Sequence, residues 1–81
     1  MDIKVLGPGC RNCVSLERVT REALGSLGID AEIEKVTDYA AIAGYGVMST
    51  PGLVVDGEVV LSGRVPTAAR VREILQSRTA A

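Results

Sequence analysis

The 81-residue chain is long enough for one hydrophobic core, and we expect a single domain over residues 1–81. Its nine basic and ten acidic residues give a net charge of −1 with no basic stripe, which argues against nucleic-acid binding and against a role at a membrane surface. The absence of histidine excludes Ser-His and Cys-His nucleophile pairs, so any catalysis must use cysteine, carboxylate, amine or hydroxyl groups.

The first half of the chain reads as a strand, a helix and a strand. Residues 3–6 form a short apolar run bounded by glycine and proline, which is typical of a buried strand. From Asn12 the apolar residues recur at steps of three and four, which predicts a helix ending at Gly25 and Gly28, with Gly28 as the left-handed cap. Residues 30–36 alternate in polarity and predict a half-exposed strand, parallel to the first. The polar side chains expected on the outward face of the helix are Glu17, Arg18, Arg21 and Glu22.

The second half predicts a short helix, a hairpin and a final helix. Thr37 or Asp38 can cap a helix over residues 39–43, which the following glycines stop. An Asp-Gly pair between the β-branched runs 53–55 and 58–61 predicts a tight hairpin. A last helix is capped by Thr67, and we expect its end to fray from residue 78 onward. The apolar face of that helix comprises Ala68, Val71, Ile74 and Leu75.

The element order is therefore βαβαββα. It predicts an α/β fold in which a mixed four-stranded sheet carries helices on both faces. The apolar run at the N-terminus is too short for a signal peptide, and no run approaches the ~20 residues of a membrane helix. We therefore expect a cytoplasmic protein, where two closely spaced cysteines are more often catalytic or metal-binding than structural.

The chain has two cysteines, Cys10 and Cys13, between a glycine-rich turn and the first helix. We expect Cys10 at the N-terminal edge of that helix and Cys13 inside its first turn. The free backbone N–H groups and the helix dipole lower the pKa of a cysteine at such a position, and Arg11 adds a nearby positive charge. Cys13 lies on the same side of the helix and can reach back to resolve a mixed disulfide.

Two thiolates at this spacing could instead hold Cu(I), since small copper chaperones also place a CxxC pair at a helix start after a first strand. Those domains run βαββαβ, whereas residues 37–46 read as helical here and the chain ends in a helix. They also usually carry a methionine where Pro8 stands. Zinc would find its tetrahedral site half filled unless two chains shared it, and we expect no metal site. A non-catalytic binding module is the third interpretation.

The element order and the position of the cysteines together resemble the thioredoxin fold over nearly the whole chain. The sequence GCRNC at residues 9–13 and the sequence TP at residues 50–51 carry this resemblance. The stretches "GIDAEIEKV" and "TPGLVVDGEVVLSGRV" are most similar to small thioredoxin- or glutaredoxin-like proteins of archaea and bacteria. The resemblance implies a cis bond before Pro51. The residues that it assigns to substrate binding and to shaping the site are Gly9, Arg11, Asn12, Thr50 and Pro51.

The resemblance implies a thiol-disulfide oxidoreductase that reduces or exchanges protein disulfides, as a reductase or electron carrier. Cys10 would be the nucleophile and Cys13 the resolving residue. No cofactor is expected beyond the redox-active disulfide between them. The implied partners are disulfide-containing proteins and an upstream reductase similar to thioredoxin reductase, and we expect a monomer. The copper-binding module remains the alternative.

Overall fold

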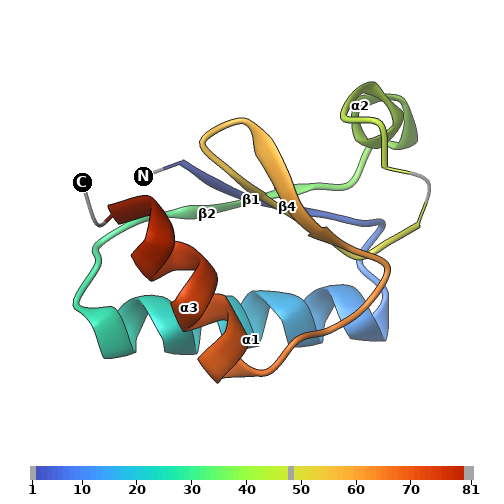
Figure 1. The fold of residues 1–81 in the computed structure, drawn as a ribbon. Helices are drawn as coiled ribbons and strands as arrows, with labels where there is room; N and C mark the ends of the chain where they lie inside the picture. Colours follow the sequence, from blue (N-terminus) through green and yellow to red (C-terminus); the bar gives the residue numbers. More distant parts are fainter. Residues whose placement is uncertain (1, 48, 80–81) are drawn as a thin grey trace.

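The computed structural model describes residues 2–47 and 49–79, and its elements follow the predicted order (Figure 1). In chain order these elements are β1 (Ile3–Leu6), α1 (Arg11–Leu27), β2 (Ile33–Val36), α2 (Tyr39–Gly44), β3 (Gly52–Val55), β4 (Glu58–Ser62) and α3 (Ala68–Thr79). The strands form one sheet in the order β2-β1-β3-β4. β1 is parallel to β2 and antiparallel to β3, and β3 is antiparallel to β4. The mixed four-stranded sheet is thus confirmed.

The two faces of the sheet carry separate apolar clusters, because alternate residues of a strand point to opposite sides. Ile3 and Val5 of β1 belong to the larger cluster, which also contains buried residues of α1 and α3. Leu6 belongs to the smaller cluster, with Val54 of β3 and Ile42 of α2. Helices α1 and α3 therefore lie against one face and α2 against the other (Figure 1), which confirms the prediction of helices on both faces.

The predicted helix boundaries hold for α1 within a residue or two. The helix begins at Arg11, and Gly25 lies inside it. Gly28 adopts φ 70° and ψ 24°, so it is the left-handed C-cap that the sequence predicts. Its N–H group is directed at the carbonyl oxygens of Leu24 and Gly25, which satisfies acceptors at the end of the helix.

The strands differ from prediction mainly in length. β2 begins at Ile33 and not at residue 30, because β1 offers partners for only four residues, from Ile3 beside Ile33 to Leu6 beside Val36. In the hairpin, Asp56 has φ 51° and Gly57 has φ 83°, so both central residues have positive φ as a type I′ turn requires.

The caps of the two later helices are settled by their hydrogen bonds. Asp38, not Thr37, caps α2, since its carboxylate accepts a hydrogen bond of 3.2 Å from the N–H of Ala41. Thr67 caps α3 as predicted and accepts a hydrogen bond from the N–H of Arg70. The expectation of fraying is wrong at Arg78 itself, because α3 extends to Thr79 and the guanidinium of Arg78 pairs with Glu58 of β4. Residues 80 and 81 lie outside the described part.

This topology brings the C-terminal end of β1 to the N-terminal end of α1 at one end of the sheet (Figure 1). Gly7 continues the pairing of β1 with β2, because its N–H donates to the carbonyl of Val36 at 2.9 Å. The chain then turns through residues 8 and 9 into Cys10. In the described ranges, no helix is both long and apolar enough to cross a membrane.

Candidate active site

Cys10 is the N-cap of α1, where a helix leaves backbone N–H groups without partners inside the helix. Its backbone is extended, with φ −70° and ψ 168°, and its Sγ accepts a hydrogen bond of 3.2 Å from the N–H of Cys13. Its carbonyl accepts the bond of 3.0 Å from the N–H of Val14 that starts the helix. The sulfur of Cys10 therefore occupies the place where a capping oxygen usually lies.

Cys10 and Cys13 form a disulfide, with their Cα atoms 5.0 Å apart. The two residues have very different surroundings. Cys10 is exposed, whereas Cys13 is only 5% exposed. An incoming disulfide can therefore approach Cys10 from solvent, while the body of the protein covers Cys13.

Gly7 is the residue that lets β1 pass close to the disulfide. A Cβ atom at this position would overlap the Sγ of Cys13 and would lie 3.8 Å from the Cβ of Thr50. Gly7 is buried, so a side chain could not turn away into solvent. The absence of a side chain at Gly7 is thus a packing requirement of the site.

The segment before β3 forms the other wall of the site. The peptide bond between Thr50 and Pro51 is cis, as the family resemblance implies. Pro51 is buried, and its carbonyl accepts a hydrogen bond of 2.8 Å from the N–H of Gly63. Thr50 therefore lies near the point where Gly7 meets Cys13, and Pro51 ties this segment to the residue that follows β4.

The remaining predicted residues lie around Cys10. Gly9 has φ 91°, in the left-handed region that glycine adopts without strain, and a Cβ there would meet nothing within 4 Å. Arg11 and Asn12 are exposed in the first turn of α1. The structure therefore gathers all the predicted site residues at one end of the sheet.

Glu17 is the residue that the sequence interpretation placed wrongly. We expected it on the outward face of α1, but its side chain is only 14% exposed, whereas that of Glu22 is 56% exposed. It lies one helical turn after Cys13, and both residues line a small cavity of about 50 Å³ with Val5 and Lys35. The four-residue spacing from Cys13 was the available signal, because such residues are neighbours on a helix.

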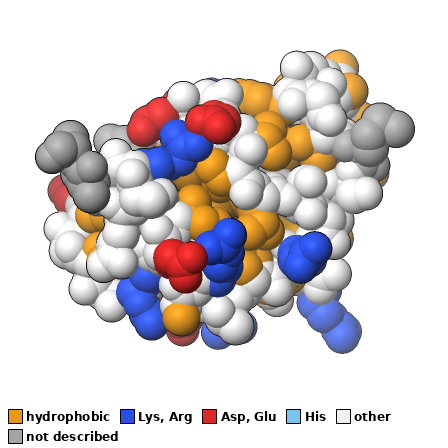
Figure 2. Space-filling model, viewed as in Figure 1, with side chains coloured by type: hydrophobic (Ala, Val, Ile, Leu, Met, Phe, Trp, Pro, Cys, Tyr) orange, Lys and Arg blue, Asp and Glu red, His pale blue; other side chains and the backbone are white. Residues whose placement is uncertain are grey.

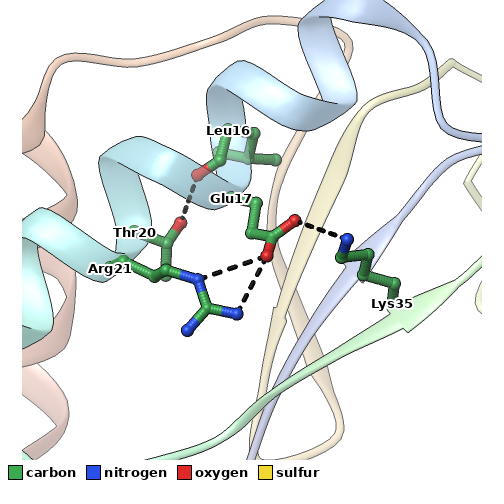
Figure 3. Close-up of polar contacts among 5 residues, drawn as sticks. All are labelled: Leu16, Glu17, Thr20, Arg21 and Lys35. Atoms are coloured by element: carbon green, nitrogen blue, oxygen red, sulfur yellow. Dashed lines mark hydrogen bonds and ion pairs between the residues drawn. The ribbon is translucent and has the colours of Figure 1, made fainter.

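The carboxylate of Glu17 is held by two cations from different elements (Figure 3). Oε2 accepts hydrogen bonds from Nε and Nη2 of Arg21, at 3.2 and 2.9 Å. Oε1 lies 3.1 Å from Nζ of Lys35 on β2. The bond to Arg21 and, to a lesser extent, Lys35 hold the pKa of Glu17 below its usual value against the opposing effect of burial. Two cations and one carboxylate leave this cluster with a net positive charge, and its members Glu17 and Lys35 line the same small cavity as Cys13.

Comparison with known proteins agrees with this geometry. A model of the thioredoxin domain family matches residues 1–76. A curated protein named thioredoxin from Methanothermobacter thermautotrophicus is 45% identical over 75 residues, covering 93% of this chain and 97% of its own. A second thioredoxin, from Methanocaldococcus jannaschii, is 40% identical over 75 residues, covering 93% of this chain and 86% of its own.

The chain belongs to the thioredoxin family. With the CxxC disulfide at the start of α1, this membership establishes a thiol-disulfide oxidoreductase. As a member of the family, the protein exchanges electrons with disulfide substrates and with a reductase. The thioredoxin-like fold predicted from the order of elements is therefore confirmed.

The copper-binding alternative gains no support from the structure or from the relatives of this thioredoxin-family protein. The two cysteine sulfurs are bonded to each other.

Proposed function

We propose that Cys10 is the attacking residue and Cys13 the resolving residue of a cycle that reduces disulfides in protein substrates. The observation that carries this assignment is the contrast between an exposed sulfur at the end of α1 and a buried sulfur in its first turn. The N–H groups at the start of the helix and the helix dipole favour a thiolate at Cys10. Burial of Cys13 keeps its thiol away from other disulfides.

The proposed cycle balances without any further cofactor. In the reduced protein, the Cys10 thiolate attacks one sulfur of the substrate disulfide, and the other substrate sulfur leaves as a thiolate that takes a proton from solvent. Cys13 then loses its proton and attacks Sγ of Cys10. The bond between Cys10 and the substrate breaks, and the Cys10–Cys13 disulfide forms. The substrate gains two electrons and two protons, which an upstream reductase restores to the protein.

We assign substrate contact to the residues around the two sulfurs. Pro51 has no N–H and its carbonyl accepts a hydrogen bond from Gly63, so its own backbone offers a substrate no free donor, while Cys10, Arg11 and Asn12 are exposed to an approaching substrate. The residues proposed to shape this approach are Gly9, Arg11, Asn12, Thr50 and Pro51. We further propose a cytoplasmic monomer whose electron donor is similar to thioredoxin reductase.

Trapping of the mixed disulfide tests the assignment. Cys13→Ser should accumulate covalent adducts with disulfide-containing proteins, because nothing resolves the bond at Cys10. Cys10→Ser should accumulate few adducts, because its remaining thiol is buried. Non-reducing electrophoresis with mass analysis of the adducts measures both. Adducts formed mainly by Cys10→Ser would reverse the assignment, and adducts from neither variant would contradict the proposed cycle.

The electron donor is tested by supplying candidate reductases one at a time. A flavin-dependent thioredoxin reductase with its nicotinamide cofactor should convert the disulfide form to the dithiol form, whose mass is greater by two hydrogen atoms. A ferredoxin-linked reductase and glutathione serve as the comparison donors. Reduction by glutathione alone would contradict the proposed donor.

A further inference from the structure

Acidic side chains gather at the end of the sheet far from the disulfide. Ile3 lies beside Ile33 on β2 and beside Val55 on β3. The segments just before β1, just before β2 and just after β3 therefore lie together at that end. Asp2 and Asp56 are joined there by two hydrogen bonds. The acidic residues of the segments at this end are Asp2, Asp30, Glu32, Asp56 and Glu58. Arg78 pairs with Glu58, and Nζ of Lys4 lies 4.0 Å from a carboxylate oxygen of Asp2. Five acidic and two basic side chains leave an acidic excess at this end.

The end that carries the disulfide has the opposite charge. Arg11 follows Cys10 directly, and Arg64 follows Gly63, which is hydrogen-bonded to Pro51. Both arginines are exposed, and no ion pair or hydrogen bond of either side chain occurs within the described part of the chain. The right-hand side of Figure 2, where α1 begins in Figure 1, shows basic side chains and no acidic ones on this face.

Other charges at this end do not reverse its sign. Glu17 is compensated by Arg21 and Lys35. Asp38 lies in the loop after β2, where its carboxylate caps the first turn of α2. The net charge of −1 therefore conceals a separation of charge along the sheet, with the positive end at the site of reaction.

An open groove begins near this positive end of the sheet. It starts at Ser62, next to Gly63, and follows β4, the edge strand of the sheet, to the start of α3. Apolar side chains and two arginines line it: Val60, Leu61, Val65, Pro66, Arg64 and Arg70. Arg70 is paired with Glu73 at 2.6 Å, so Arg64 is the arginine of this groove that offers a free charge.

We propose that Arg11 and the groove at Arg64 bind an acidic, extended segment of a partner protein that lies next to the partner's target disulfide. This inference rests on the proposed function and names the class of substrate that it favours. An extended segment fits an open groove along an edge strand, and aspartate or glutamate side chains complement the two unpaired arginines. Attraction of an acidic surface toward the positive end also orients the partner's disulfide toward Cys10 and raises the rate of encounter.

Competing disulfide peptides test this specificity. Two peptides of equal length each carry one disulfide, flanked by Asp and Glu in the first and by Lys and Arg in the second. Hydroxyethyl disulfide, which is small and uncharged, reports on the exchange chemistry alone. Each peptide rate is divided by the rate for hydroxyethyl disulfide. At low salt this ratio should be about tenfold higher for the acidic peptide, and the preference should collapse at ~0.5 M salt because screening removes the attraction.

Arginine variants locate the effect. Arg11→Gln and Arg64→Gln should each lower the preference for the acidic peptide severalfold, and the double variant should abolish it. Arg72→Gln removes the same charge from α3, away from the groove lining, and should leave the preference unchanged.

The outcomes separate this proposal from the proposed function. Reduction of hydroxyethyl disulfide without a preference for the acidic peptide would overturn the docking surface and leave the redox function standing. A preference that survives high salt, or that survives the double variant, would also overturn it. Failure to reduce any of the three disulfides would overturn the proposed function, and the docking surface with it.

Discussion

The two ends of α1 satisfy their free backbone groups in different ways. At the C-terminal end, Gly28 in the left-handed conformation directs its N–H group at the last carbonyls, as in many helices. At the N-terminal end, the cap is the sulfur of Cys10, 3.2 Å from the N–H of Cys13. Cysteine is not among the residues that favour this position, which are Asn, Asp, Ser, Thr and Gly.

This difference indicates that the C-terminal end is optimised for the helix and the N-terminal end for chemistry. The N–H groups that a serine or aspartate would bind tightly remain available to stabilise a thiolate when the disulfide opens. The close approach of Gly7 to Cys13 belongs to the same end. Substitutions at the two ends should therefore have different costs.

The largest effect is expected at Gly7. In Gly7→Ala the new Cβ would overlap Sγ of Cys13, so β1 or the disulfide must shift, and the free energy of unfolding should fall by about 1–3 kcal/mol. Urea denaturation of the oxidised protein measures the loss. Gly44→Ala is the control, because a Cβ at Gly44 meets no atom within 4 Å and its φ lies outside the left-handed region. Equal stability of Gly7→Ala and wild type would show that this end of the site is not tightly packed.

The cap itself gives the next effect. In the reduced state, Cys10→Ser should be more stable than Cys10→Ala by about 1 kcal/mol, since a hydroxyl can accept the N–H bond that a methyl group cannot. Thermal denaturation of both variants with a reductant present measures the difference. Both variants lack the disulfide, so the difference between their stabilities reports only on the hydrogen bond at the N-cap. Identical stabilities would mean that the side chain at position 10 contributes nothing to the helix.

A smaller effect of opposite sign is expected at the other end of α1. Gly25→Ala should raise the free energy of unfolding by about 0.5–1 kcal/mol, because Gly25 lies within the helix and its Cβ would meet no atom within 4 Å. Gly28→Ala, at φ 70°, should lower it instead. Chemical denaturation resolves the two signs, and destabilisation by both substitutions would contradict the cap geometry.

The smallest effect concerns Glu17 and depends on pH. Because Arg21 and Lys35 lower the pKa of Glu17 in the folded protein, its contribution is present above its unfolded pKa and is lost as the pH falls through the lower folded pKa. Glu17→Gln should therefore cost up to about 1 kcal/mol at pH 7, since both cations are largely exposed, and the cost should vanish in acid. Glu22→Gln is the control, as its pair with Arg18 is exposed and 3.7 Å long. A cost that grows toward acidic pH would contradict the ion-pair cluster.

The order of the elements, the mixed sheet and the features set by local sequence could be predicted, whereas details set by contacts between distant residues could not. The Asp56-Gly57 turn and the Gly28 cap follow from the conformations that these residues allow. The length of β2 depends on how many residues of β1 are available to pair with it. The alternation of polar and apolar residues within β2 does not reveal that number. The helical pattern predicts Glu17 on the outward face, whereas its contact with Lys35, which lies on β2, could not be predicted from the sequence of the helix alone.

In the site, too, the features that depend on local sequence could be predicted and some contacts between distant residues could not. The positions of both cysteines follow from the start of the helix. The cis bond at Pro51 came from the family resemblance, since the local residues alone do not determine it. The glycines at positions 7 and 9 indicate a turn in which the backbone approaches closely, but only the arrangement of β1 and α1 in the folded chain shows that Gly7, and not Gly9, lies against Cys13.

The central claim is that the exposed, helix-capping Cys10 begins the reaction and the buried Cys13 completes it. Alkylation of the reduced wild-type protein across a range of pH, resolved for each cysteine by peptide mass analysis, tests this claim most directly. Cys10 should react at least about tenfold faster than Cys13 at neutral pH, with a pKa below that of a free cysteine. Equal rates at the two thiols, or faster alkylation of Cys13, would contradict the account.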